Sequence, residues 1–250
     1  MNLKVIEPND GALESLDHYH ELAVQELMHF SRLITIGELS SCFAHEVTNP
    51  LMLIRGHLQF LEEASVTEGH PLRMHLDVID RASKRIEEMT RRMLDFSRKR
   101  TPRIEKSDFG ELISDAIRFV QPYFHTQSID VRVHTEPGLP VLSLDKWQML
   151  QALVNLLQNA ADAMADQPER VLSVTAGVEG NFIRVAISDT GSGIAAANIP
   201  HIFEPFFTTK GERGTGLGLY ITRQVIRDHR GTIDVETSDR GTTFVISLPL

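Results

Sequence analysis

The sequence predicts a two-part protein: a helical hairpin that forms a dimeric four-helix bundle, then an α/β sandwich in which helices cover one face of a mixed sheet. Apolar residues recur at helical spacing from about residue 16 to residue 96. After residue 104 the pattern changes to short alternating runs, glycine-rich turns and further helical stretches. A length of 250 residues is enough for two modest domains, each with its own core.

Composition narrows the class of protein. The hydrophobic content of 42% and charged content of 24% are ordinary for a globular chain. A formal charge of −9 argues against broad nucleic-acid binding, which needs an excess of Lys and Arg. The single cysteine, Cys42, excludes an intramolecular disulfide and fits a reducing compartment. Because no run approaches the ~18 apolar residues of a membrane span and no secretory pattern opens the chain, we expect a cytoplasmic protein.

The first predicted segment, residues 16–103, follows a flexible lead-in at 1–15 that holds Pro8 and Gly11. Its two helices are joined by a turn at 65–71 and end near Pro102. In the first helix the apolar positions fall within roughly 80° of one another on a helical wheel; they are Phe43, Val47, Leu51, Ile54, Leu58 and Leu61. The second helix carries a heptad seam, made of Leu72, Leu76, Ile79, Ala82, Ile86, Met89, Met93 and Phe96.

The apolar face of this hairpin is too large to leave in contact with water. Two hairpins that pair into a four-helix bundle would bury it, so we predict a homodimer built by residues 16–103. The alternative is a hairpin that packs against its own C-terminal domain.

The stretch FAHEVTNPL, residues 43–51, displays polar groups opposite the apolar stripe. His45 lies about 150° from the centre of the stripe, so we expect its imidazole to face solvent. Glu46 and Asn49 lie beside it. The alternative is an ordinary solvated helix face, since the chain carries 11 histidines.

Residues 104–250 form the second predicted domain, after a linker at 101–107. We expect helices at 108–125, 145–165 and 217–229 and strands at 131–133, 170–178, 182–188, 231–236 and 242–248. Asp145 and Gln148 form a capping-box arrangement at the start of the second of these helices.

Two polar motifs lie on these elements. Asn155 and Asn159 are four residues apart on one helix and share a side, so their amide oxygens are candidate Mg²⁺ ligands. The alternative is plain helix surface. The block DTGSGI, which contains Asp189, Gly191 and Gly193, follows a predicted strand. It is either part of a nucleotide site or an ordinary turn.

A stronger signal is the block GTGLGLY at 214–220, in which Gly214, Gly216 and Gly218 alternate just before a helix. Such glycines let backbone N–H groups approach phosphates at a helix N-terminus. The spacing is neither that of the Walker loop nor that of the dinucleotide fingerprint.

Between the two glycine blocks lies IFEPFFTTKGERGTG. Phe203, Phe206 and Phe207 are interpreted as an aromatic anchor for a mobile flap, from which Lys210 could reach a phosphate. The alternative is a disordered loop with a hydrophobic foot.

The order of these blocks resembles that of the sensor histidine kinases of bacterial two-component systems, over roughly residues 30–250. FAHEVTNPL is similar to the phosphoacceptor box and NLLQNAADAM, at 155–164, to the asparagine box. DTGSGI and GTGLGL resemble the two glycine boxes, and FEPFFTTK the phenylalanine box that starts the ATP lid. The asparagine box is most like that of the nitrogen-regulation subtype.

The resemblance implies the fold shared with gyrase, heat-shock chaperone ATPases and mismatch-repair ATPases, and an ATP-dependent kinase. His45 would attack the γ-phosphate of ATP, and Glu46 would act as general base. Asn159, with Asn155 nearby, would hold Mg²⁺. Asn49 occupies the place where relatives use a polar residue to hydrolyse the partner's phosphoaspartate.

The resemblance also assigns the nucleotide contacts. Asp189 would accept a hydrogen bond from the adenine amino group, with the backbone at Gly191 and Gly193 close to the base. Lys210 would offset phosphate charge. The remaining lid positions are Gly214, Gly216, Leu217 and Gly218.

The implied partners are a second copy of the chain and the receiver domain of a separate response regulator. Relatives often carry a basic or amide residue where this chain has Thr48, which leaves the implied phosphatase activity open. Residues 1–30 are too few for a sensory domain, so we expect either a separate sensory protein or a longer receptor. The alternatives are an ATPase or Ser/Thr kinase of the same fold, or a scaffold pseudokinase.

Overall fold

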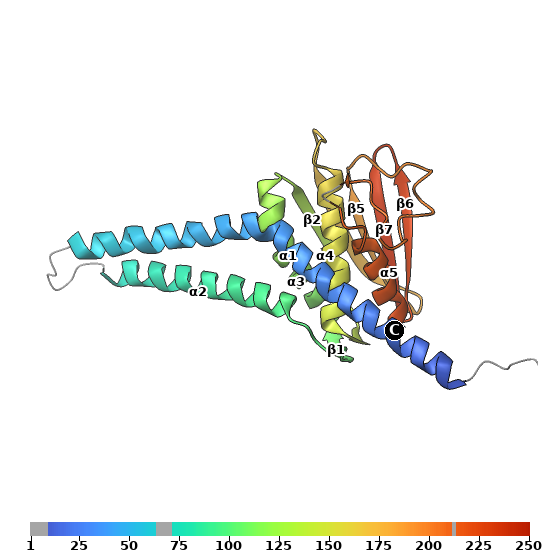
Figure 1. The fold of residues 1–250 in the computed structure, drawn as a ribbon. Helices are drawn as coiled ribbons and strands as arrows, with labels where there is room; N and C mark the ends of the chain where they lie inside the picture. The colour runs from blue at the N-terminus through green and yellow to red at the C-terminus, as the bar shows by residue number, and fades with distance from the viewer. Residues whose placement is uncertain (1–9, 64–71, 212–213) are drawn as a thin grey trace, which may run out of the picture.

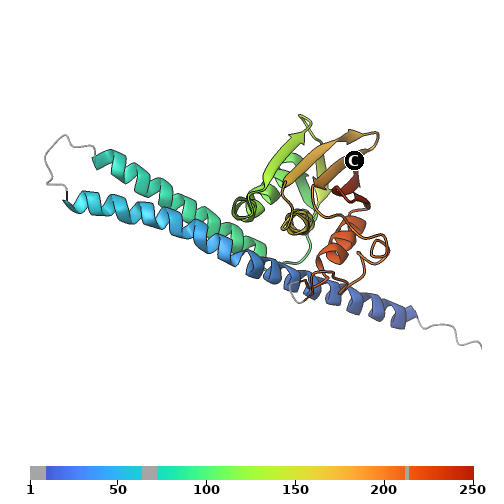
Figure 2. The same cartoon turned by 90° about the horizontal axis from the view of Figure 1, so that it is seen from above.

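The computed structural model describes residues 10–63, 72–211 and 214–250 (Figures 1 and 2). Helices α1 (Asp10–Glu63) and α2 (Leu72–Ser97) lie side by side as the expected hairpin. The predicted turn at 65–71 and the first nine residues of the lead-in lie outside the described residues. The lead-in prediction is wrong from Asp10 onward, because α1 already begins there.

The hairpin buries its seam only near its junction with the rest of the chain. Ala82, Met89 and Phe96 of α2 are buried, as are Leu39 and Phe43 of α1. Towards the far end, the same stripes stay open: Leu51 and Leu58 are 50% and 46% exposed, and Leu76 is 56% exposed. A single copy of the chain therefore leaves much of the predicted apolar face in contact with water.

The second part is built on a mixed sheet. Within the described residues its strand order is β2-β4-β5-β7-β6, and β2 pairs with β4 in parallel while the other pairs are antiparallel. Its strands are β2 (Asp130–Thr135), β4 (Val171–Glu179), β5 (Phe182–Asp189), β6 (Thr232–Ser238) and β7 (Gly241–Pro249). The register places buried Val185 opposite buried Ile246, so the alternating apolar residues form one inner face.

Helices α3 (Phe109–Thr126), α4 (Lys146–Ala163) and α5 (Gly218–Asp228) cover that inner face (Figures 1 and 2). One side of α4 packs in the core, since Leu150, Leu153, Val154 and Leu157 are all buried. The helix ends at Ala163, two residues earlier than predicted. The predicted α/β sandwich is confirmed.

Helix α4 starts at the predicted N-cap, but only half of the capping box forms. The Asp145 carboxylate accepts hydrogen bonds from the backbone N–H groups of Trp147 and Gln148, at 3.0 and 2.9 Å. The reciprocal bond is different from the prediction: the Asp145 N–H donates to Nε2 of His229, at 2.8 Å. Gln148 instead points its amide towards α1, with Nε2 3.9 Å from the sulfur of Met28.

A second, two-stranded sheet was not predicted. Strands β1 (Glu105–Asp108) and β3 (Val141–Leu144) pair in an antiparallel register, with Glu105 opposite Leu144. The predicted linker at 101–107 therefore includes part of a strand. Each strand is only four residues long, which is too short for an alternating pattern to stand out.

The N-terminal half of α1 packs against this second part. Arg32 donates to the side chain of Gln151 in α4 at 3.3 Å, and Gln151 donates to the Met28 carbonyl at 3.0 Å. The ring of Phe119 in α3 meets those of Phe43 and Phe96, with centroids 5.6 and 4.4 Å apart. Around these residues, the hairpin does pack against its own C-terminal domain. Among the described helices, none has the length and apolar character needed to cross a membrane.

Candidate nucleotide site and phosphoacceptor helix

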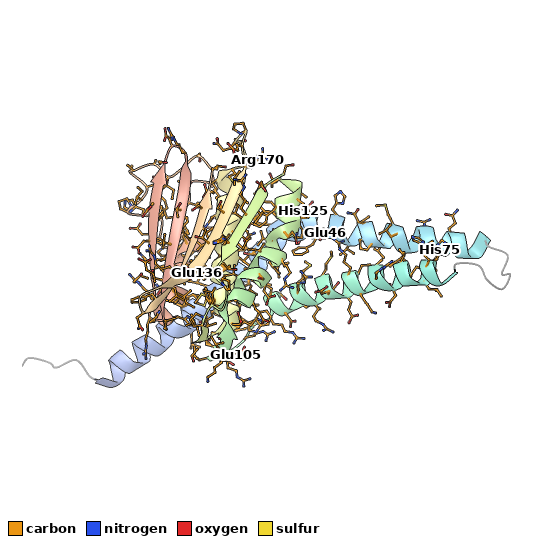
Figure 3. The ribbon with its side chains drawn as sticks, turned by 180° about the vertical axis from the view of Figure 1, so that it is seen from behind. Glu46, His75, Glu105, His125, Glu136 and Arg170 are labelled. Atoms are coloured by element: carbon orange, nitrogen blue, oxygen red, sulfur yellow. The ribbon has the colours of Figure 1, made fainter. Side chains whose placement is uncertain are left out.

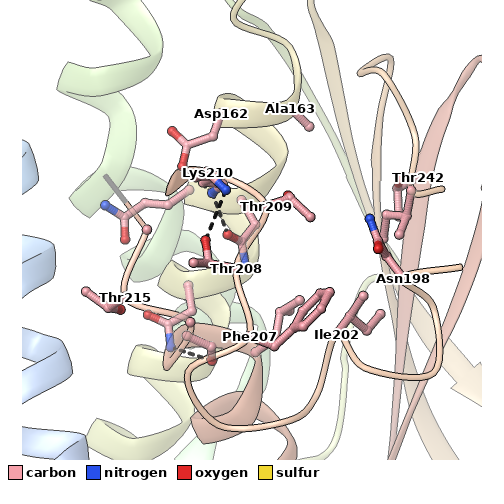
Figure 4. A pocket seen from close by; sticks show the side chains of 18 of the residues that line it. Asp162, Ala163, Asn198, Ile202, Phe207, Thr208, Thr209, Lys210, Thr215 and Thr242 are labelled. Carbon is pink, nitrogen blue, oxygen red and sulfur yellow. Dashed lines mark hydrogen bonds and ion pairs between the residues drawn. The ribbon is translucent and has the colours of Figure 1, made fainter. Parts of the chain in front are cut away.

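A cavity of about 540 Å³ opens between α4, the C-terminal end of β5, the segment 192–216 and α1 (Figure 4). Its wall brings together most of the cofactor-binding residues predicted from the sequence: Asn155, Asn159, Asp189, Gly193, Lys210, Gly214, Gly216 and Gly218. These residues are spread over more than 60 positions of sequence. Their convergence on one cavity is what a ligand site requires.

Asp189 ends β5 and is buried, with 8% of its surface exposed. Its Oδ1 accepts hydrogen bonds from the backbone N–H of Gly191 at 2.8 Å and of Thr242 at 3.3 Å. Burial raises the pKa of the Asp189 carboxyl above its ordinary value, and the two backbone donors partly oppose the shift. With Oδ1 held by two donors, Oδ2 is the atom that can accept from a ligand.

Gly191 and Leu217 do not line the cavity, although both were predicted to bind the cofactor. Gly191 is buried, and a Cβ there would lie 2.6 Å from Oδ1 of Asp189 and 2.7 Å from the Cβ of Ala163. Leu217 is 5% exposed and packs in the core at the start of α5. Both act through packing: one lets the chain pass close to Asp189, and the other anchors the helix.

The two asparagines of α4 are not equivalent. Asn155 is only 5% exposed, and its Nδ2 donates to the carbonyl of Gly218 at 3.1 Å, which ties α4 to α5. The expected polar ridge is therefore partly an interior contact. Asn159 is less buried, and its Oδ1 accepts from Nζ of Lys210 at 2.9 Å.

The Lys210 ammonium also lies 2.5 Å from Oδ2 of Asp162 (Figure 4). Thus an amide oxygen and a carboxylate oxygen converge on one cation in the cavity. Oxygen donors of this kind suit Mg²⁺, and the ammonium indicates that the position accepts positive charge. The oxygen donors present therefore fit a divalent cation at this position.

The segment between β5 and α5 follows the wall of the cavity. A Cβ at Gly216, whose φ is +68°, would lie 2.2 Å from the backbone carbon of Phe206, so glycine is required there. Phe203 and Phe207 pack against the core, in agreement with the predicted anchor. Phe206 does not: it is 65% exposed, with a φ of +66°.

Helix α5 begins at the cavity without a side-chain cap. Its N-cap residue is Leu217, which makes no side-chain capping hydrogen bond. Gly218 and Leu219, in the first turn, line the cavity. The first N–H groups of a helix carry partial positive charge and lack intrahelical partners, so this end suits a phosphate group.

The predicted catalytic residues lie on α1, outside the cavity wall. His45 is exposed, as expected from the helical wheel, and so is Asn49. The Glu46 carboxylate is 19% exposed and lies 3.9 Å from Nδ1 of His125 in α3 (Figure 3). A guanidinium nitrogen of Arg85 in α2 lies at the same distance from it. The carboxylate beside His45 thus lies at the junction of three helices.

Sequence reasoning missed one wall of the cavity. It comes from α1, which contributes Ser31, Ile34, Thr35 and Glu38. Burial and the nearby Asp162 raise the pKa of the Glu38 carboxyl, while Lys210 opposes the shift. No local pattern marks these residues, because the contact depends on how α1 docks. Asp162 was also missed, although its position one turn after Asn159 could have indicated it.

Comparisons with known proteins agree with both halves of this description. Residues 144–250 match the family model "Histidine kinase-, DNA gyrase B-, and HSP90-like ATPase", and residues 36–102 match "His Kinase A (phospho-acceptor) domain". An ATP-binding catalytic domain joined to a phosphoacceptor hairpin defines a class of signalling enzyme. The chain therefore carries the two domains that sensor histidine kinases combine.

The relatives include the sensor histidine kinase ZraS of Escherichia coli K12, 30% identical over 92% of this chain and 49% of the relative. The sensor protein FixL of Bradyrhizobium diazoefficiens is 34% identical over 90% of this chain and 45% of its own length. The histidine kinase/phosphatase NtrB of Rhizobium leguminosarum is 31% identical, over 90% of this chain and 61% of its own length. The chain spans about half the length of the first two.

Solved structures give the same result. The catalytic domain of histidine kinase ThkA matches with a TM-score of 0.54 and 30% identity, covering 59% of this chain and 95% of that one. A structure of ThkA in complex with the response regulator TrrA matches with a TM-score of 0.52 and 26% identity. It covers 90% of this chain and 65% of that one.

Proposed function

We propose that this protein is an ATP-dependent protein-histidine kinase that phosphorylates His45 and passes the phosphoryl group to an aspartate of a separate response regulator. The observation that carries the proposal is the pairing of a solvent-facing histidine on a helical hairpin with a cavity lined by Asp189, Asn159 and the lid glycines. The two family matches support both halves.

In this proposal the cavity holds Mg-ATP. Adenine binds at Asp189, whose free Oδ2 accepts from the exocyclic amino group. The phosphates lie towards the first turn of α5 and Gly216, where uncapped N–H groups face the cavity. Asn159, with Asn155 behind it, holds Mg²⁺, which neutralises charge on the phosphates as phosphoryl transfer requires.

On the hairpin, Glu46 orients the His45 imidazole and accepts its other ring proton, so that the free nitrogen attacks the γ-phosphorus while its bond to the bridging oxygen breaks and ADP leaves. Arg85 and His125 each lie 3.9 Å from that carboxylate and are near enough to influence its orientation. Asn49 lies one turn after Glu46 and acts in hydrolysis of the regulator's phosphoaspartate. The name of NtrB as a kinase/phosphatase supports that second activity.

Transfer requires a movement. The α1 residues on the cavity wall end at Glu38, seven positions before His45, which places the histidine about 10 Å further along the helix axis. The described arrangement is therefore a resting state of the kinase. The catalytic domain moves along or away from α1 to bring the γ-phosphate to His45.

Two proposed partners, a second copy of the chain and a response regulator, rest on different observations. Leu51, Leu58 and Leu76 are exposed in one copy of the chain, which supports a homodimer that buries them in a four-helix bundle. The complex of ThkA with TrrA supports a response-regulator receiver domain as the second partner.

The test is labelling with ATP that carries radioactive γ-phosphate. The wild-type protein is expected to gain acid-labile, base-stable label, and His45→Gln is expected to lose it while binding nucleotide normally. His134→Gln, at an exposed histidine of β2, is the matched control and is expected to label like the wild type. Label that persists in His45→Gln, or that resists acid, contradicts the proposal and favours another acceptor.

A further inference from the structure

The lid lysine stands where the proposed metal would bind. Nζ of Lys210 is 2.9 Å from Oδ1 of Asn159 and 2.5 Å from Oδ2 of Asp162. Asn159 is the residue assigned above to Mg²⁺. A single side chain on the lid therefore supplies positive charge to the metal's own oxygen ligand.

Asp162 is poorly placed for the stability of its own helix. It lies in the last turn of α4, which ends at Ala163, and the C-terminal end of a helix disfavours negative charge. Glu38 of α1 brings a second carboxyl close to it, and that proximity helps raise the pKa of Glu38. An acid in this position needs a compensating cation, and Lys210 provides one.

Asp162 is also fixed in direction. The hydroxyl of Tyr123 in α3 donates to its Oδ1 at 2.7 Å, which leaves Oδ2 to face the lid. Burial, and then the charge of Asp162, raise the pKa of Tyr123 well above its ordinary value, so the phenol keeps its proton. The carboxylate is thus held between a donor behind it and an ammonium in front of it.

We propose that Asp162 is a positioning residue that holds Lys210 at the Asn159 oxygen while the site is empty, so that the bound nucleotide's metal and the lysine exchange places. This inference rests on the proposed function, because it takes Asn159 as the metal ligand. On binding, the divalent cation takes over Asn159, and Lys210 turns from Asp162 to the phosphates. The lid lysine therefore has a carboxylate partner in one state and a phosphate partner in the other.

The proposed exchange predicts the direction in which a substitution of Asp162 changes nucleotide affinity. The ion pair must break before Lys210 reaches the nucleotide, so removing the carboxylate should tighten nucleotide binding. The side chains of Lys210 and Asp162 are 37% and 32% exposed, and a pair this open is worth little. We expect Asp162→Asn to bind nucleotide about two- to fivefold more tightly than the wild type. If Asp162 were a metal ligand, the same substitution would weaken binding.

The experiment measures binding of a non-hydrolysable ATP analogue with Mg²⁺ by calorimetry, on the full chain. Asp162→Asn is expected to tighten binding, and Lys210→Met to weaken it. The double variant is expected to bind like Lys210→Met, because the gain depends on the lysine. Hydrogen exchange at the amides of Thr209 and Lys210 should be faster in nucleotide-free Asp162→Asn than in the wild type, and similar once both are saturated.

Asp115→Asn is the matched control. Asp115 lies on α3, is 35% exposed and contacts two cations, Arg118 and Lys146, away from the cavity. It is expected to leave both readouts unchanged. Weaker binding by Asp162→Asn, or unchanged binding and exchange, would overturn the holding role while leaving the proposed function intact. A wild-type protein that binds no analogue would overturn the metal exchange together with the proposed function.

Discussion

Asp189 illustrates how one side chain can be set for binding at a cost in stability. The carboxylate is buried at the end of β5, and both backbone donors that reach it contact Oδ1. Burial raises its pKa, which means that the ionised carboxylate is less stable in the folded protein than in the unfolded chain. That cost is consistent with a residue kept for a ligand.

We expect Asp189→Asn to lower nucleotide affinity by about ten- to hundredfold, the loss typical of a hydrogen bond to a charged group. The amide oxygen must keep accepting from Gly191 and Thr242, so the NH₂ group would face the adenine amino group, donor against donor. Calorimetry with a non-hydrolysable ATP analogue measures the loss. Unchanged affinity would show that adenine does not bind at this carboxylate.

The same variant has an opposite effect on stability. Because the folded pKa of Asp189 is raised above its ordinary value of 3.8, the wild type loses stability as pH rises from about that value through the folded pKa. The neutral amide removes this loss, so the stability of Asp189→Asn relative to the wild type should be higher at pH 7 than near pH 4. Thermal unfolding of both proteins across this pH range measures the effect. If the pKa of Asp189 were not raised, the difference in stability between the two proteins would be the same at every pH.

At the scale of the elements, α4 depends on a buried residue just before its first turn. Asp145 caps its N-terminus through Oδ1, and Oδ2 accepts from the backbone N–H of Arg103 at 2.5 Å. The carboxylate is 5% exposed, so its removal would leave buried donors without partners. Because α4 carries Asn155, Asn159 and Asp162, this cap also supports the site.

We expect Asp145→Ala to lower the free energy of unfolding by about 1–2 kcal/mol, the upper range for loss of an N-cap. Asp108→Ala provides a comparison, because Asp108 caps α3 through one bond to Glu111, at 3.0 Å, from an exposed position. Its loss should be smaller. Denaturant unfolding of the two variants measures the difference, and equal losses would argue against the role of burial at Asp145.

Elements with a strong local signal could be predicted from sequence. The capping residue Asp145, the alternating strand FIRVAISD and the spaced glycines before α5 each carry their own physical signature. The short strands β1 and β3 do not, and the capping box failed because a distant residue, His229, took the bond. In the site, Asp189 and Asn159 follow from local blocks, whereas Glu38 enters the wall only through the docking of α1.

At the scale of the whole molecule, the docking of α1 separates the two halves of the proposed chemistry. The N-terminal half of α1 runs along the second part of the molecule (Figure 2) and contacts α4 through Arg32. It also contributes one wall of the cavity, and His45 lies seven residues after the last of these wall residues, Glu38. The contact includes a buried pair, Arg32 and Gln151, of which Gln151 is 0% exposed. Burial lowers the pKa of Arg32, which reflects the cost of holding that charge inside.

The hydrogen bond from Arg32 to Gln151 is the part of this contact that favours the docked arrangement. Replacing Arg32 by Ala leaves the amide oxygen of Gln151 without its donor in the docked state, at a cost of about 1–3 kcal/mol. In the released state, water can donate a hydrogen bond to the Gln151 amide oxygen, so the substitution carries no such cost there. The substitution should therefore shift the population towards released molecules, by roughly fivefold or more.

We therefore expect Arg32→Ala to raise the initial rate of His45 phosphorylation at saturating ATP and to increase the radius of gyration measured by X-ray scattering. Arg118→Ala removes an exposed arginine of α3 that pairs with Asp115, and it is expected to change neither. A slower rate in Arg32→Ala with nucleotide affinity intact would mean that the docked arrangement itself carries out the transfer. Because His45 lies about two helical turns past the cavity wall, we expect release to precede chemistry.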